Sequence, residues 1–310
     1  MRHWWKMWDA LAHLRFGWRC LLKCGLFLVA LFFVLNPHLR LFIRQLWNYA
    51  HVEALIQTDF AGMTQINQEI DTLVPNGATQ EAEFNIIQNY VYRNIPYQYD
   101  WDNWGNVDFW PTAAEVWQRK REDCDGQAVL AVSILRARGF QDATLAGSFR
   151  HIWVNVGKIG LMSPDTEQNL RRENGKTIVT LPSLKLLLQN SAIFWGAFPV
   201  MRNLLLLFVL LGLAYHPCRR VTPFLGITIS GLIGYLLMKD WARIMQRADS
   251  LVINANLLLG AGFLAAAVLY PCFMDGRLLR RIRFFRVHLK KNDQFHYELH
   301  APDASKSPGA

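Results

Sequence analysis

The apolar residues of this chain are concentrated in four long stretches. They cover about residues 21–35, 204–215, 221–238 and 251–273. A helix needs about 20 mostly apolar residues to cross a lipid bilayer. The fourth stretch is long enough, the third is nearly so, and the first reaches this length when it is extended back to Trp18. The pattern predicts four transmembrane helices.

Residues 37–192, between the first two membrane segments, have the periodicities of a globular domain instead. Helical spacing predicts a helix at residues 81–93, a capping box at Thr112 and Glu115 predicts the start of another, and a third begins at Cys124. Alternating polar and apolar positions predict strands at residues 143–148, 151–156 and 159–162. Helices followed by antiparallel strands predict an α+β domain.

Basic residues occur on one side of these predicted spans. They precede the first stretch, fill the short loop at residues 216–220 and follow the fourth stretch at residues 277–291. Cytoplasmic loops of membrane proteins carry such an excess, so we expect a multi-pass protein of the cytoplasmic (inner) membrane with both termini in the cytoplasm. The loop at residues 239–250 runs against this rule, because its basic residues would lie outside.

These signals divide the chain into four parts. They are a basic cytoplasmic N-terminus with the first membrane anchor (1–36), an extracytoplasmic domain (37–192), three transmembrane helices (193–274) and a basic cytoplasmic tail (275–310). The formal net charge of +9 belongs mostly to the tails and short loops, where it attracts anionic lipid headgroups. We therefore expect the lipid bilayer as a partner and no nucleic acid.

Cys124 is the one cysteine of the central segment. The others, Cys20, Cys24, Cys218 and Cys272, lie in or beside predicted membrane helices. Exported domains usually contain paired cysteines or none. A single thiol in such a domain indicates chemistry, and the alternative is a small buried residue at a helix start.

The surroundings of Cys124 suggest a nucleophile. It occupies the first turn of a predicted helix, where free amide N–H groups and the helix dipole favour a thiolate. His151, at the start of a predicted strand, is the candidate base, and Asp165 is the candidate group that orients its imidazole. Asp123 and Asp125 flank the cysteine and oppose the thiolate, which makes a nearby cation or His151 more necessary.

The motifs together are similar to a known family. Residues 102–112 lead into Glu115, Asp123-Cys124-Asp125 follows, and His151-Ile152-Trp153-Val154 precedes Asp165. This pattern resembles the transglutaminase-like (papain-like) superfamily, and within it most closely the bacterial transglutaminase-like cysteine proteinases. The resemblance covers about residues 90–165 and does not reach the membrane part. It implies an α+β transglutaminase-like fold with Cys124 as nucleophile, His151 as general base and then acid, and Asp165 as orienter.

Two further features of the site follow from the chemistry and the resemblance. An oxyanion hole would use the backbone N–H of Cys124 and a second donor from the side chains of Trp104, Asn103 or Trp110. The chemistry requires no cofactor, but the relatives that it resembles can depend on calcium. A calcium ion takes six to eight oxygens, and Asp123 and Asp125, with Asp100, Asp102 and Asp108, are the candidate ligands.

The expected function is that of a membrane-anchored thiol hydrolase. It would cleave peptide or amide bonds of a protein or peptide in the cell envelope through a thioacyl intermediate. Acyl transfer to an amine, which would cross-link proteins, shares the first half-reaction and stays an alternative. A second alternative is a non-catalytic sensor or scaffold that binds a peptide. A transporter is little supported, because the predicted membrane helices contain few polar residues.

Overall fold

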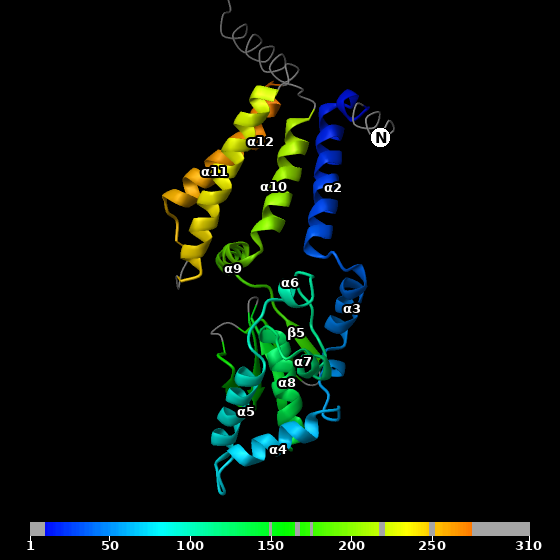
Figure 1. Ribbon diagram of the computed structural model, residues 1–310, viewed down its shortest axis with the longest axis vertical. Coiled ribbons are helices and arrows are strands. Elements are labelled where there is room, and N and C mark those ends of the chain that lie inside the picture. Colours follow the sequence, from blue (N-terminus) through cyan, green and yellow to red (C-terminus); the bar gives the residue numbers. More distant parts are fainter. Residues whose placement is uncertain are drawn as a thin grey trace, which may run out of the picture.

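The computed structural model describes residues 10–148, 151–164, 168–173, 176–216, 221–247 and 252–274. It is elongated, with a bundle of apolar helices at one end and a domain of helices and strands at the other (Figure 1). The domain is formed by the chain between α2 (Phe16–Leu35) and α9 (Leu184–Ala197). The apolar and the mixed segments of the sequence are thus separated in space.

The bundle consists of α2 and α9 together with α10 (Val200–Tyr215), α11 (Val221–Met245) and α12 (Ala255–Met274). Both α2 and α11 are long and apolar enough to cross a membrane, and α9 with α10, bent by 108°, adds a third span if the pair is one broken helix. The apolar part of α12 is shorter, Ala255–Pro271. The described chain therefore supports a membrane protein with two or three candidate spans, and the fourth span stays a prediction.

Two glycines bring α11 and α12 close together. A Cβ added to Gly234 would lie 2.9 Å from the carbonyl oxygen of Gly260, and one added to Gly260 would lie 3.0 Å from the amide nitrogen of Met238. Apolar burial does not drive helices together inside a bilayer, so small residues that allow close packing take over this role. The α11–α12 contact is of this kind.

The domain contains seven helical segments in the described chain, which fits the mostly helical character of the protein. They are α3 (Leu39–Ala50), η1 (Val52–Leu55), α4 (Met63–Leu73), α5 (Gln80–Asn94), α6 (Asp100–Asn103), α7 (Ala113–Arg119) and α8 (Cys124–Ala137). The helices expected at residues 81–93 and from Cys124 are confirmed. The capping box is confirmed too, since Thr112 accepts the N–H of Glu115 and the Glu115 side chain accepts the N–H of Thr112.

One antiparallel sheet completes the domain. Its strands are β1 (Ala143–Gly147), β2 (Ile152–Val156), β3 (Ile159–Leu161), β4 (Leu170–Glu173) and β5 (Lys176–Val179), in the order β3-β2-β1-β4-β5. The first three strands agree with the sequence pattern, and β1 pairs with β2 from Ala143 opposite Val156 to Gly147 opposite Ile152. The last two strands were not predicted.

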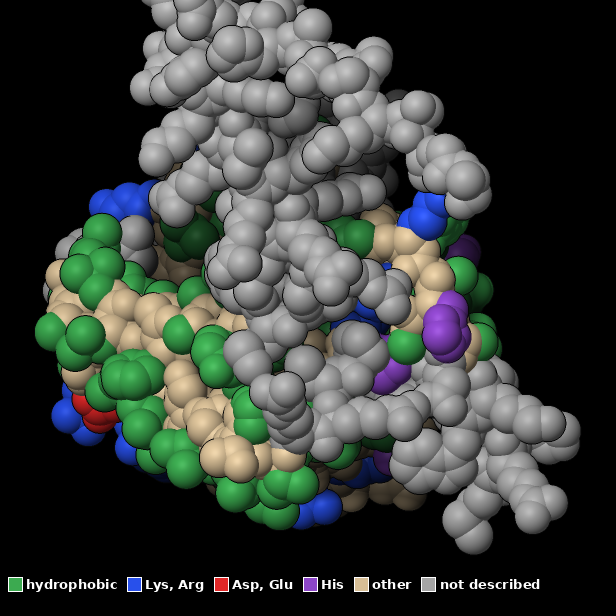
Figure 2. Space-filling model, turned by 90° about the horizontal axis from the view of Figure 1, so that it is seen from above, with side chains coloured by type: hydrophobic (Ala, Val, Ile, Leu, Met, Phe, Trp, Pro, Cys, Tyr) green, Lys and Arg blue, Asp and Glu red, His purple; other side chains and the backbone are tan. Residues whose placement is uncertain are grey.

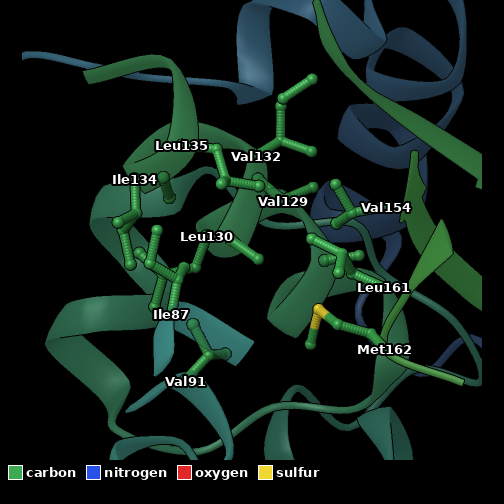
Figure 3. Packing of buried hydrophobic residues seen from close by; sticks show 14 of the residues in the cluster. Ile87, Val91, Val129, Leu130, Val132, Ile134, Leu135, Val154, Leu161 and Met162 are labelled. Carbon is green, nitrogen blue, oxygen red and sulfur yellow. The ribbon is translucent and has the colours of Figure 1, made fainter. Parts of the chain in front are cut away.

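The core of the domain is built around α8. This helix is buried on all sides from Asp125 to Leu135, so it lies between other elements instead of on the surface. Figure 3 shows its side chains between Ile87 and Val91 of α5 on one side and Val154 of β2 on the other. A helix that is fixed all round positions its first residue, Cys124, rigidly.

The structure also bears on the fold class and the boundaries. The chain is mostly helical with one antiparallel sheet and candidate membrane helices, which is the coarse combination expected. The proposed end of the extracytoplasmic domain at residue 192 falls inside α9, which runs from Leu184 to Ala197. The transglutaminase-like fold itself stays a prediction.

Candidate functional site

Cys124 lies where α8 meets the sheet. It is the first residue of the helix, after the N-cap Asp123, whose side chain accepts the N–H of Asp125 at 3.2 Å. The sulfur is partly buried and lies near the backbone N–H of Ile152, which favours the thiolate. Because Ile152 directly follows His151 and begins β2, this places the predicted nucleophile beside the strand of the predicted base.

His151 has a defined orientation. Its Nε2 lies 2.8 Å from the carbonyl oxygen of Met162, and its ring stacks on Trp153 with the ring centroids 6.2 Å apart. A carbonyl oxygen only accepts hydrogen bonds, so in the neutral imidazole Nε2 carries the proton and Nδ1 is the acceptor. This tautomer leaves Nδ1 as the basic atom of the ring.

The turn that holds His151 is strained. Met162 and Ser163 have φ of 67° and 58°, the left-handed region that L-residues adopt at a cost of roughly 1–3 kcal/mol. The N–H of Met162 donates to the side chain of Gln88 on α5 at 2.5 Å. Gln88 and Met162 thus position the histidine. The sequence analysis missed both, because neither residue type signals such a role.

The third member of the predicted triad, Asp165, lies outside the described residues. It follows Met162 by three residues in the sequence. Its role as the group that orients His151 stays a prediction. Among the described residues, the carbonyl of Met162 is the partner of Nε2.

The pKa of Cys124 is raised, in contrast to the thiolate expected at a helix start. Burial raises it well above the usual range, and the charge of Asp123 raises it further, while the nearby N–H of Ile152 opposes both. Burial and the neighbouring acids thus oppose the thiolate that the helix N-terminus favours. The thiol is the resting form, so a base must take its proton when the sulfur reacts.

Three carboxylates meet beside Cys124. One oxygen each of Asp100, Asp123 and Asp125 lies within 4.8 Å of the others. Burial and the charges of the neighbouring acids raise the pKa of Asp125 well above normal, that of Asp100 to about 11 and that of Asp123 to about 6. Asp100 and Asp125 are buried, and Oδ1 of each has no hydrogen-bond partner.

This cluster fits a hard divalent cation. Calcium binds through oxygens and favours carboxylates, and the two buried oxygens without partners are free for it. The structure brings the predicted pair Asp123 and Asp125 together with Asp100. It does not bring in the other two candidates, since Asp102 is exposed and Asp108 accepts hydrogen bonds from Gln45, at 2.7 Å, and Tyr49.

The predicted oxyanion side chains have structural partners. The indole N–H of Trp104 and the side-chain amide of Asn103, the latter at 2.8 Å, both donate to Oε1 of the buried Glu122. Trp110 is buried in the hydrophobic core. Asn103 and Trp104 thus hold the loop before Cys124 through Glu122. The backbone N–H of Cys124 remains the candidate oxyanion donor.

A row of aromatic rings connects the site with the membrane helices. Tyr97 contacts Tyr99 edge to face, with centroids 5.3 Å apart, and Tyr99 stacks on Trp101 at 4.3 Å. Burial and the charges of Asp123 and Cys124 raise the pKa of both tyrosines, which places them near the cysteine. Trp101 in turn packs edge-on against rings at the end of α9, Phe194 and Phe198, each with centroids 5.5 Å away.

The end of the domain that carries Cys124 therefore faces the bundle. The short helix α6, which carries Asp100 and Trp101, lies at the end of the domain nearest to α9 and the other bundle helices (Figure 1). Arg202 at the start of α10 donates to the carbonyls of Trp101, at 3.5 Å, and Val34, at 3.4 Å. Asp100 of the acidic cluster is thus next in sequence to Trp101, which contacts the bundle.

Comparisons with protein-family models, curated proteins and solved structures found no match. The resemblance to transglutaminase-like proteins thus depends on the motifs described above and stays a prediction.

Proposed function

We propose that this protein is a membrane-anchored thiol hydrolase of the transglutaminase-like type, with Cys124 as nucleophile and His151 as general base. The observation that carries the proposal is the closeness of the Cys124 sulfur to the backbone N–H of Ile152, which lowers the pKa of the thiol. This places the start of a rigid helix beside the residue after a histidine whose Nε2 is already bound. The remaining nitrogen, Nδ1, is then the base.

The reaction begins from the protonated thiol. The sulfur of Cys124 attacks the carbonyl carbon of a peptide or amide bond while Nδ1 of His151 takes the thiol proton. The backbone N–H of Cys124 stabilises the oxyanion. The C–N bond breaks as the amine leaves with that proton, and water then hydrolyses the thioester, returning a proton to the sulfur.

Supporting groups complete the proposed site. The carbonyl of Met162 fixes the tautomer of His151, and Asp165 is the acid that the resemblance assigns to the same purpose. A calcium ion on Asp100, Asp123 and Asp125 would offset the charges of Asp123 and Asp100, which raise the pKa of Cys124. The protein residues carry out every bond change, and the ion adjusts the charge around them.

The proposed substrate is a protein or peptide at the outer surface of the cytoplasmic membrane. The aromatic row from Tyr97 to Phe198 connects the cysteine with the membrane helices, which favours a segment close to the bilayer. Positive charge at the chain ends favours four spans with both termini in the cytoplasm. An amine in place of water would turn hydrolysis into cross-linking by the same first step.

A second candidate is a non-catalytic peptide-binding sensor or scaffold. The raised pKa of Cys124 favours it, because a thiol that keeps its proton is a poor nucleophile. The two candidates differ in whether His151 and calcium activate the sulfur.

The test is alkylation of the purified full-length protein with iodoacetamide from pH 5 to 9, with and without calcium, with the adduct mapped to Cys124. We expect rapid labelling below the pKa of about 8.5 of a free thiol when calcium is present, and loss of this labelling in His151→Ala. His51→Ala, at an exposed position of the same domain, is the control. Equal labelling of Cys124 in wild type and His151→Ala under all conditions would favour the scaffold.

A further inference from the structure

A cavity of about 350 Å³ lies between α2, α10 and α12. Its residues come from the start of α2 and the ends of α10 and α12, which lie at the end of the bundle far from the Cys124 domain (Figure 1). Most of the wall is apolar, as at Phe27, Leu210 and Leu213. The size and lining suit part of a hydrocarbon chain.

Two cations line the same cavity. Arg19 and Lys23 are four residues apart on α2, so their side chains share one face of the helix. Arg19 is only 5 % exposed, and Nζ of Lys23 donates to the carbonyl of His216 at 2.5 Å.

Figure 2 views this end of the molecule, where Lys, Arg and His side chains are visible beside hydrophobic ones. A basic group that lies partly inside a membrane gains free energy from a phosphate, which accepts charge-assisted hydrogen bonds from Lys and Arg. Basic pockets between membrane helices bind acidic lipid headgroups in this way.

We propose that the cavity binds one anionic phospholipid, with its phosphate at Arg19 and Lys23 and an acyl chain against the apolar wall. A soluble phosphate compound would use the two cations but would leave the apolar wall unused, which is why the lipid is the better occupant. In the topology proposed above this lipid belongs to the cytoplasmic leaflet, where anionic lipids create a negative surface potential. The site involves no residue of the Cys124 reaction.

The experiment is native mass spectrometry of the delipidated full-length protein in detergent, titrated with phosphatidylglycerol or with phosphatidylcholine. We expect one phosphatidylglycerol to bind in preference to phosphatidylcholine. Arg19→Gln and Lys23→Gln should each weaken it about fivefold, equivalent to ~1 kcal/mol per basic residue. Arg15→Gln removes the same charge from an exposed position one turn earlier and should leave the affinity unchanged.

A second variant tests the cavity without changing charge. Ala214→Phe fills the space beside the wall and should weaken lipid binding while the thermal unfolding midpoint of the Cys124 domain stays the same. Equal affinity for both lipids, or an equal effect of Arg15→Gln and Arg19→Gln, would overturn the proposal. Displacement of the lipid by millimolar inorganic phosphate would also overturn it, since a soluble phosphate would then be the ligand.

Discussion

At the scale of residues, the chemistry of Cys124 depends on its neighbours more than on its helix. A helix N-terminus supplies about half a positive charge, whereas burial and the acids beside Cys124 raise its pKa. The carboxylates therefore outweigh the dipole. In the proposed reaction, attack at neutral pH requires that Nδ1 of His151 accepts the proton and that a cation offsets the acids.

Replacement of Gln88 tests whether the turn at Met162 orients His151. Gln88→Ala removes the acceptor of the Met162 N–H, and an unsatisfied buried donor costs about 1–3 kcal/mol. We expect a lower thermal unfolding midpoint and slower alkylation of Cys124 in the presence of calcium. Gln88→Glu keeps an acceptor oxygen and should restore much of the alkylation rate.

The control for this change is Gln80→Ala at the exposed start of the same helix, which should alter neither quantity. If the Gln88→Ala variant loses stability but its Cys124 is alkylated at the wild-type rate, Gln88 supports the fold without positioning the base.

The acidic cluster makes stability depend on pH, and calcium should remove this dependence. The raised pKa values, about 6 for Asp123 and about 11 for Asp100, mean that the folded state without metal holds protons that the unfolded state releases near pH 4. Stability without calcium should therefore fall as the pH rises from about 4 through 6 and beyond. Calcium displaces these protons, so its stabilising effect should grow with pH.

The measurement is the thermal unfolding midpoint between pH 5 and 8, with a chelator or with calcium. Asp100→Asn should raise the midpoint at pH 8 in the chelator and remove the calcium effect. Asp102→Asn, at an exposed position of the same helix, should change neither. A midpoint that rises with pH in the chelator would contradict the pKa directions on which the cluster is based.

At the scale of elements, α3 is connected to α7 by one ion pair. Both guanidinium nitrogens of Arg44 donate to Glu115 at 2.6 Å, and Glu115 also caps α7 through the N–H of Thr112. Burial alone would raise the pKa of Glu115, but the hydrogen bonds from Arg44 and Thr112 outweigh it, and the pKa is lowered. Its contribution is present above the unfolded pKa of about 4.3 and is lost as the pH falls through the lower folded value.

Glu115→Gln should therefore destabilise the domain by about 1–2 kcal/mol at pH 7, since it removes a charge-assisted pair and weakens a cap. The difference from wild type should shrink toward pH 3, which chemical denaturation at several pH values measures. Glu81→Gln, exposed in the first turn of α5, is the control and should have a small effect at all pH values.

Elements with a local signal could be predicted, and those without one could not. The capping box at Thr112 and the apolar spacing after Cys124 are local, and both helices are present. The strands β4 and β5 were missed, although Asn174-Gly175 between them is a strong hairpin signal. Their mixed, charged composition concealed the alternation that the other strands show.

In the candidate site, too, some residues have a local sequence signal and others do not. A cysteine at a helix start and a histidine at a strand start have sequence signals, and the structure brings Ile152 and Cys124 into contact. Asp100 joins Asp123 and Asp125 only through the folded loop, and Gln88 reaches Met162 from another helix. Contacts of this kind depend on tertiary packing, which residue spacing along the chain does not encode.

At the scale of the whole molecule, the domain and the bundle are joined by several contacts. Trp101 packs on Phe194 and Phe198, and Arg202 bonds to the carbonyl of Trp101. On the other side, the N–H of Val107 donates to the carbonyl of Leu35 at the end of α2 at 2.8 Å. These contacts direct the Cys124 end of the domain toward the bundle of apolar helices, so in the proposed function the orientation of the chain decides on which side of the membrane the substrate lies.

That orientation can be tested with cysteines placed at the two ends of the molecule in a background without native cysteines. Asn76→Cys lies in an exposed turn of the domain, and Arg15→Cys lies at the exposed start of α2. If both termini are cytoplasmic, a membrane-impermeant maleimide should label Asn76→Cys in cells with a permeable outer envelope and an intact inner membrane, and should label Arg15→Cys only after lysis. A cytoplasmic cysteine protein reports leakage. The reverse pattern would place Cys124 in the cytoplasm, and because positive charge favours the cytoplasmic side, it would also mean that residues 239–250 outweigh the basic ends.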